Sequence, residues 1–189
     1  TLPRYSVGMS DGGFFSAALS YIYNFKAGVQ YCSQGPVNII PLTNVPIQFC
    51  MAQFDSNPSV GAAGNAEALS NFQSLNARGV CSKYLVNGRS PFYPERFART
   101  GEISTELSAS LFNELKSNGF IDKKNYFTGY SDALISAVQT NPSNFPKIKS
   151  LSLNQLQAML SQINIAVADH HIYSDYDRAT VKFLNTQCH

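Results

Sequence analysis

Short apolar runs alternate with stretches of helical periodicity through the first half of the chain. Four apolar, β-prone runs predict strands, at residues 2–7, 27–32, 45–52 and 80–86. Between the strands, residues 13–23 and residues 64–78 predict helices. Strands that alternate with helices in this way are typical of parallel βαβ units. The pattern therefore predicts an α/β fold built on a buried parallel sheet.

The pattern changes after Asn87, where helical periodicity and polar loops replace the apolar runs. Further helices are predicted at residues 104–118, 130–139, 152–163 and 178–185, and the short apolar run 165–168 is the next strand candidate. We therefore expect a single partial α/β domain over 1–189, with a helical insertion over 90–163. The insertion forms either a cap or lid over the sheet edge or a helical layer packed for stability.

Charge and hydropathy narrow the classes of partner. Lys and Arg number 14 against 12 Asp and Glu, and the basic residues are scattered, which argues against nucleic acid as a partner. No apolar run approaches the length of about 18 residues that a membrane span needs, and no charged-then-apolar leader precedes Thr1. The chain is therefore expected to be soluble. Only 14% of the residues are charged, which is typical of exported proteins and favours a secreted or periplasmic location.

The four cysteines are even in number and show no CxxC spacing: Cys32, Cys50, Cys81 and Cys188. This spacing argues against zinc and against a thioredoxin-type site. One or two disulfides are expected, with three possible complete pairings. The alternative is that some of the cysteines are small buried apolar residues.

The sequence Gly8-Met9-Ser10-Asp11-Gly12 stands where the first predicted strand meets the first predicted helix. A serine at the tip of such a turn has a strained backbone that lifts its hydroxyl out of the sheet, and the residues two before and two after it must be small. Gly8 and Gly12 meet that requirement. The backbone N–H of Asp11 can then face an oxyanion. The motif predicts a nucleophilic serine, and the alternative is an ordinary serine in a glycine-rich turn.

An acid and a histidine follow this serine along the chain. Asp55 comes just past the third predicted strand, where catalytic groups gather in open α/β sheets. His170 follows the last apolar run, 115 residues after Asp55. A serine hydroxyl needs an imidazole to accept its proton and a carboxylate to orient that imidazole. Ser10, His170 and Asp55 are therefore the expected nucleophile, base and orienting acid.

Other residues near His170 compete for these roles. His171 is the alternative base, and three acids compete with Asp55, namely Asp169, Asp175 and Asp177. These acids lie too close to the histidine in the chain to match a layout with one catalytic residue on each loop. The histidine pair does not predict a metal site, because adjacent residues rarely point to one ion and no third clustered ligand is evident. We expect neither a metal nor a cofactor.

With these motifs the sequence resembles the α/β-hydrolase superfamily. Residues 8–13, 54–58 and 170–173 look most like the branches of polyhydroxyalkanoate depolymerases and feruloyl-esterase-like enzymes. The order serine, aspartate, histidine is that of this superfamily. The resemblance implies hydrolysis of carboxylic esters through an acyl-enzyme. It also implies His170 as the catalytic base, with His171 as the alternative.

The resemblance covers only the second half of such a fold. In the family the serine turn follows the fifth strand, whereas seven residues precede Gly8 here. We therefore expect a second polypeptide, or the preceding part of a longer one, to supply the first half of the sheet and the second oxyanion donor. A circularly permuted fold is the third alternative, although the pattern after Val86 does not predict four more strands. The alternatives to an ester hydrolase are an acyltransferase with the same triad and a non-catalytic binding or structural subunit.

Overall fold

The computed structural model describes residues 2–188, which divide into two compact units. The first unit joins the chain up to Asn87 with the segment that begins at His170, and the second spans Gly88–Asp169. None of the described helices combines the length and the apolar character that crossing a membrane requires.

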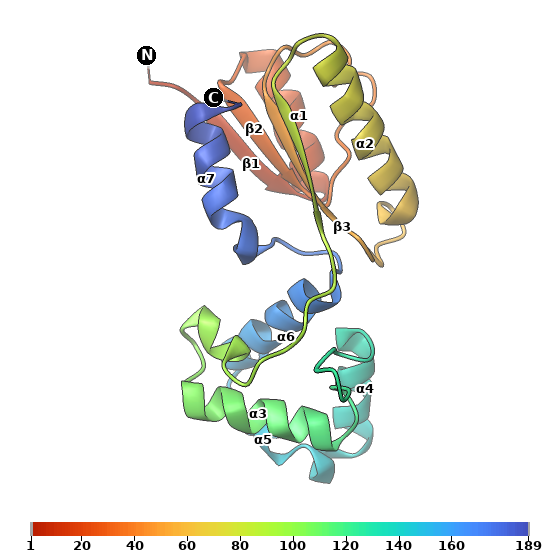
Figure 1. Cartoon of the computed structure of the whole chain (residues 1–189), viewed down its shortest axis with the longest axis vertical. Helices are drawn as coiled ribbons and strands as arrows, with labels where there is room; N and C mark the ends of the chain where they lie inside the picture. Colours follow the sequence, from red (N-terminus) through yellow and green to blue (C-terminus); the bar gives the residue numbers. More distant parts are fainter. Residues whose placement is uncertain (1, 189) are drawn as a thin grey trace. The chain divides into compact units, whose positions relative to one another are not determined.

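A four-stranded sheet forms the centre of the first unit, with all strands parallel and in the order β1-β2-β3-β4 (Figure 1). The strands are β1 (Tyr5–Met9), β2 (Ala27–Tyr31), β3 (Ile47–Ala52) and β4 (Ser82–Asn87). The expected α/β fold with a parallel sheet is thus confirmed. Met9 pairs with Tyr31, and Tyr31 with Cys50, so β1, β2 and β3 end at the same edge of the sheet.

Helices cover both faces of this sheet (Figure 1). On one face lie α1 (Asp11–Tyr23) and α2 (Gly61–Ala77), and on the other lies α7 (Asp177–Thr186), which follows the short turn η3 (Ser174–Tyr176). Every residue of β3 is buried. Phe49 packs in the same core cluster as Leu75 of α2, while the neighbouring Gln48 donates a hydrogen bond of 3.3 Å to Thr180 of α7. The central strand is therefore covered from both sides, as in other parallel sheets.

A disulfide between Cys81 and Cys188 ties the chain before β4 to the chain after α7. None of the three complete pairings is formed: within residues 2–188 this is the one disulfide, and Cys32 and Cys50 are free and buried. One disulfide together with two buried thiols matches one of the alternatives that the sequence leaves open.

The second unit is helical. Its elements are η1 (Arg96–Thr100), α3 (Thr105–Ser117), α4 (Ser131–Thr140), η2 (Pro142–Asn144), α5 (Pro146–Lys149) and α6 (Leu153–Val167). The side chains of Ser104 and Ser152 accept hydrogen bonds from the first turns of α3 and α6, as expected of helix N-caps. Within Gly88–Asp169 the one β pairing is an isolated antiparallel bridge between Ile121 and Phe127.

The prediction of a strand at 165–168 is wrong. Ile165 and Val167 belong to the last turn of α6, and Ala168 ends that helix in the left-handed conformation with φ 61°. Both side chains are buried. A buried helix end and a buried strand give the same short apolar run, so the periodicity of four residues does not separate them.

Candidate active site

Ser10 forms the whole connection between β1, which ends at Met9, and α1, which begins at Asp11. Its backbone has φ 55° and ψ −127°, a conformation that residues with a side chain rarely adopt. Hydrogen bonds hold this turn in place. The N–H of Ser10 donates to the carbonyl of Tyr31 at 3.0 Å, and its own carbonyl accepts from Gly13 at 2.9 Å. A strained residue that its surroundings hold in place is typical of functional sites.

The glycines around Ser10 differ in how tightly they are enclosed. A Cβ added to Gly8 would lie 2.2 Å from the carbonyl oxygen of Gly12, and one added to Gly13 would lie 2.7 Å from the Cβ of Ser33. A Cβ added to Gly12 meets nothing within 4 Å. The requirement for a small residue two positions before the serine therefore holds, whereas on the helix side the requirement falls on Gly13 and not on Gly12.

The N-terminus of α1 offers a hydrogen-bond donor beside Ser10. The N–H of Asp11 makes no hydrogen bond to a protein acceptor among residues 2–188, as expected for the first residue of a helix. A small pocket of about 40 Å³ opens at this point. It is lined by Ser10, Asp11, Phe14, Ser33, Gln34, Ser59 and Val60. An anionic oxygen in this pocket would meet both the free N–H and the positive end of the helix dipole.

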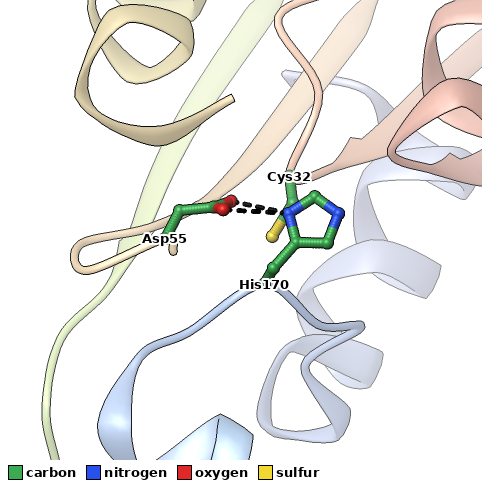
Figure 2. A group of neighbouring side chains, drawn as sticks. All are labelled: Cys32, Asp55 and His170. Carbon is green, nitrogen blue, oxygen red and sulfur yellow. Dashed lines mark hydrogen bonds and ion pairs between the residues drawn. The ribbon is translucent and has the colours of Figure 1, made fainter. Parts of the chain in front are cut away.

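Asp55 and His170 lie in direct contact (Figure 2). Asp55 stands in the loop after β3, and His170 begins the segment that leads to α7. The Nδ1 atom of His170 lies 2.8 Å from Oδ2 and 3.0 Å from Oδ1 of Asp55. Oδ1 also accepts the backbone N–H of Asn57 at 2.9 Å, which fixes the carboxylate. A proton on Nδ1 shared with Asp55 leaves Nε2 available to accept or release a second proton.

The environment of His170 favours its protonated form. The hydrogen bond to Asp55, followed by the contact with Cys32, raises the pKa of His170 to about 10, although burial acts in the opposite direction. The carboxylate side chain of Asp55 is fully buried, and the His170 side chain is only 15% exposed. The charged imidazolium therefore gains most of its stabilisation from one buried carboxylate.

Cys32 is a member of this cluster that the sequence did not indicate. It directly follows β2, has φ 46°, and its sulfur points toward the Asp55–His170 pair (Figure 2). The Sγ atom lies 3.4 Å from the carbonyl of His171 and 3.4 Å from the hydroxyl of Tyr173. Cys32 is fully buried, so its thiol is not exposed to a substrate as a nucleophile would be. The sequence places Cys32 directly after a predicted buried strand, but a cysteine that only packs in the core is found in the same position. The sequence therefore does not separate a site residue from a core residue here.

The structure thus brings together two of the expected residues and places the third at the same sheet edge. The hydroxyl of Ser10 makes no hydrogen bond to another residue within 2–188. Nε2 of His170 instead lies 3.5 Å from Nδ2 of Asn57. Because Ser10 and Cys32 follow the paired residues Met9 and Tyr31, the serine stands one strand away from the thiol that contacts His170.

The residues that compete for these roles lie close by in the chain. His171 follows His170 and accepts the Cys32 thiol through its backbone carbonyl. Asp175 is part of η3, Asp177 begins α7, and Asp169 is a buried residue of the second unit. The choice of Asp55 and His170 as acid and base stays a prediction. Comparison of the chain with family models, with curated proteins and with solved structures finds no match.

Proposed function

We propose that the chain carries the active site of a serine hydrolase that cleaves carboxylic esters. Ser10 is the nucleophile, His170 the base and then the acid, Asp55 the residue that orients His170, and the N–H of Asp11 an oxyanion donor. The observation that carries the proposal is the strained backbone of Ser10, held between a strand and a helix at the sheet edge where Asp55 and His170 are hydrogen-bonded. The resemblance of the sequence to α/β-hydrolases supports the same assignment of roles.

The reaction follows from these groups. The Oγ of Ser10 attacks the ester carbonyl carbon while its proton passes to Nε2 of neutral His170, and the carbonyl oxygen becomes an oxyanion near the N–H of Asp11. Collapse of this intermediate breaks the bond to the leaving alkoxide, which takes the proton from Nε2. Water then attacks the acyl-serine with the same proton transfers, which releases the acid and restores Ser10.

The hydroxyl of Ser10 has to turn toward Nε2 for the first step. Catalytic hydrogen bonds are often long in enzymes without substrate and become shorter when the substrate binds. The elevated pKa of His170 adds a second condition, because only the neutral imidazole accepts the proton. We therefore expect the activity to increase toward alkaline pH.

The proposed enzyme is complete only with further polypeptide along β1. Within residues 2–188, β1 has one neighbouring strand, β2. The N–H of Ser10 points toward β2, and the backbone groups of successive residues in a strand point to alternate sides. The N–H and C=O of Val7 therefore point away from β2, toward the open edge of the sheet. The side chain of Val7 is 52% exposed, and on α1 Phe15 and Ile22 are 63% and 64% exposed. An open strand edge beside exposed apolar side chains is an unfavourable free surface. An N-terminal half of the sheet would cover it and supply a second oxyanion donor.

We also place the enzyme in an oxidising compartment, outside the cell or in a periplasm. The Cys81–Cys188 disulfide is consistent with such a location. The low share of charged residues supports the same location.

A fluorophosphonate probe tests the proposed active site, because it reacts with activated serines and not with ordinary ones. In native preparations of the protein we expect the probe to label Ser10 and labelling to disappear in Ser10→Ala. Ser117→Ala is the control, since Ser117 is an exposed serine of α3 outside this pocket and its replacement should leave the labelling unchanged. Absence of labelling in a preparation whose folding is verified would overturn the proposal and favour a non-catalytic binding subunit.

The intact mass of the native protein tests whether further polypeptide supplies the N-terminal half of the sheet. A bound polypeptide or a longer chain of comparable additional size is the expected result. A chain of 189 residues that is alone in solution and hydrolyses p-nitrophenyl esters through Ser10 would overturn this part of the proposal.

A further inference from the structure

Three side chains with metal-binding atoms meet in the first unit, and one of them is the proposed base, His170 (Figure 2). They are Cys32 after β2, Asp55 after β3 and His170 before α7. One ligand atom from each, namely the sulfur, a carboxylate oxygen and a ring nitrogen, lies within 4.8 Å of the others. The three residues come from three separate segments of the chain, so the cluster results from the fold and not from a local sequence motif.

We propose that Cys32, Asp55 and His170 form a zinc-binding site that competes with catalysis. A thiolate, an imidazole and a carboxylate are all common ligands of Zn²⁺. In a tetrahedral site with a Zn–S bond of about 2.3 Å and Zn–N and Zn–O bonds of about 2.0–2.2 Å, the ligand atoms lie about 3.3–3.6 Å apart. Because the ligand atoms of the cluster lie within 4.8 Å of one another, no separation exceeds the tetrahedral one by more than about 1.5 Å. Three protein ligands leave the fourth position for water.

The surroundings of the ligands support this site. The hydroxyl of Tyr173, itself fully buried, lies 3.4 Å from the sulfur of Cys32 and can donate to a thiolate. The backbone N–H of Asn57 donates to Oδ1 of Asp55 at 2.9 Å, which leaves Oδ2 for the metal. Hydrogen bonds of this kind orient the ligands of metal sites and contribute to affinity. The partly exposed His170 provides the side from which the ion enters.

Zinc bound at this site blocks the proposed reaction, because it changes which nitrogen of His170 carries the proton. Binding releases the thiol proton of Cys32 and the proton that His170 shares with Asp55. With zinc on Nδ1, the proton of the neutral ring resides on Nε2, so Nε2 has no lone pair for the serine proton. The carboxylate that orients the ring is also taken by the metal. The inhibition rests on the proposed function, whereas the binding of zinc does not.

Cobalt substitution tests the binding without any measurement of activity. Co²⁺ added to the full chain should produce the near-ultraviolet absorption of a cobalt–thiolate bond, and zinc should abolish it. We expect Cys32→Ser to remove this absorption. Cys50→Ser is the matched control, because Cys50 is the other free, buried cysteine and should leave the absorption unchanged. Absence of the cobalt–thiolate band, or its persistence in Cys32→Ser, would overturn the site.

A second pair of variants guards against a Cys32 variant that fails to fold. His170→Gln changes a residue that is partly exposed, and we expect it to weaken zinc binding at least about tenfold. His171→Gln should bind zinc as the unchanged chain does. Equal affinity in His170→Gln and in the unchanged chain would overturn the assignment of His170.

The inhibitory role has a separate readout. Zinc should slow the fluorophosphonate labelling of Ser10 in the unchanged chain and in Cys50→Ser, but not in Cys32→Ser. A cobalt band without any effect of zinc on labelling would overturn the inhibition and keep the metal site. If Ser10 is not labelled at all, the proposed function fails, and the cobalt band alone decides the zinc site.

Discussion

The Nδ1 atom of His170 lies 2.8 Å from the Oδ2 atom of Asp55, although 115 residues separate the two in the chain. The contact joins the loop after β3 to the segment before α7. It gives the imidazole a fixed orientation and a defined proton on Nδ1. The proposed mechanism depends on this proton, because it leaves Nε2 as the atom that exchanges a proton with Ser10.

Replacement of Asp55 by Asn should therefore abolish most of the activity while the fold is retained. The amide holds the ring but stabilises the wrong tautomer, and the corresponding change in a serine protease costs about 10⁴-fold in rate. The measurement is the rate of p-nitrophenyl ester hydrolysis by the native preparation. Asp175→Asn, in η3, is the control and should hydrolyse the ester at the unchanged rate. Activity of Asp55→Asn within a few-fold of the unchanged protein would exclude Asp55 as the orienting acid.

The rate of serine labelling should increase with pH. His170 accepts a proton only in its neutral form, and its contacts with Asp55 and Cys32 raise its pKa to about 10. The labelling rate should increase about tenfold for each pH unit below that value. In Cys32→Ala the midpoint should move to lower pH, because one of the two contacts that raise the pKa is lost. A rate that is independent of pH between 7 and 10 would contradict the role of His170 as the base.

The same pair makes the stability of the fold dependent on pH, and the sign follows from the direction of the shift. The pKa of His170 is about 10 in the folded state and about 6.5 in an unfolded chain. Below pH 6.5 both states bind the proton, and the stabilisation is fully present. Between these values the folded state keeps a proton that the unfolded state has released, so the stabilisation decreases as the pH increases and is lost above 10.

Urea unfolding at a series of pH values measures this contribution. The free energy of unfolding of Asp55→Asn should decrease less between pH 6.5 and pH 10 than that of the unchanged chain. Asp175→Asn should show the same pH dependence as the unchanged chain. Parallel curves for Asp55→Asn and the unchanged chain would mean that the pair does not hold its proton as proposed.

The alternation of strands and helices could be predicted because burial on both faces gives the strands continuous apolar runs. β3, for example, reads Ile-Gln-Phe-Cys-Met-Ala and is buried at every position. The position of Asp55 could be predicted from the rule that catalytic groups gather past the ends of parallel strands, and Asp55 does follow β3. His170 follows α6 and not a strand, so this rule does not explain its contact with Asp55. The parallel sheet of the first unit and the position of Asp55 are therefore encoded in simple patterns.

Cys32 could not be predicted as a member of the site, because its role depends on the strand register. Tyr31 pairs with Met9 on one side and with Cys50 on the other, which places Cys32 between the serine turn and the Asp55 loop. Neither the cysteine nor its neighbours carry this information in a local pattern. The end of α6 at 165–168 could not be predicted for a different reason. Its short apolar run fits a buried strand and a buried helix end equally well.

The two glycines of the serine turn should respond differently to alanine. In Gly8→Ala the new methyl group would lie 2.2 Å from the backbone oxygen of Gly12, so the turn has to open. We expect a loss of about 2–3 kcal/mol in the free energy of unfolding. In Gly12→Ala the methyl group meets nothing within 4 Å and Gly12 lies in α1, so we expect no loss or a gain of up to about 1 kcal/mol. Thermal or urea unfolding checks both variants, and equal effects would contradict the geometry of the turn.

Replacement of Ser10 by glycine should stabilise the fold while it removes the reactive hydroxyl. The backbone of Ser10, at φ 55° and ψ −127°, costs about 1–3 kcal/mol for a residue with a Cβ and little for glycine, although glycine also adds entropy to the unfolded chain. We therefore expect Ser10→Gly to increase the free energy of unfolding by about 1 kcal/mol over Ser10→Ala, which keeps the Cβ and hence the strain. Neither variant should react with the fluorophosphonate probe. If Ser10→Gly is no more stable than Ser10→Ala, the turn is not strained. If it is more stable, the native serine is kept at this position at the expense of stability, as expected of a residue selected for its chemistry.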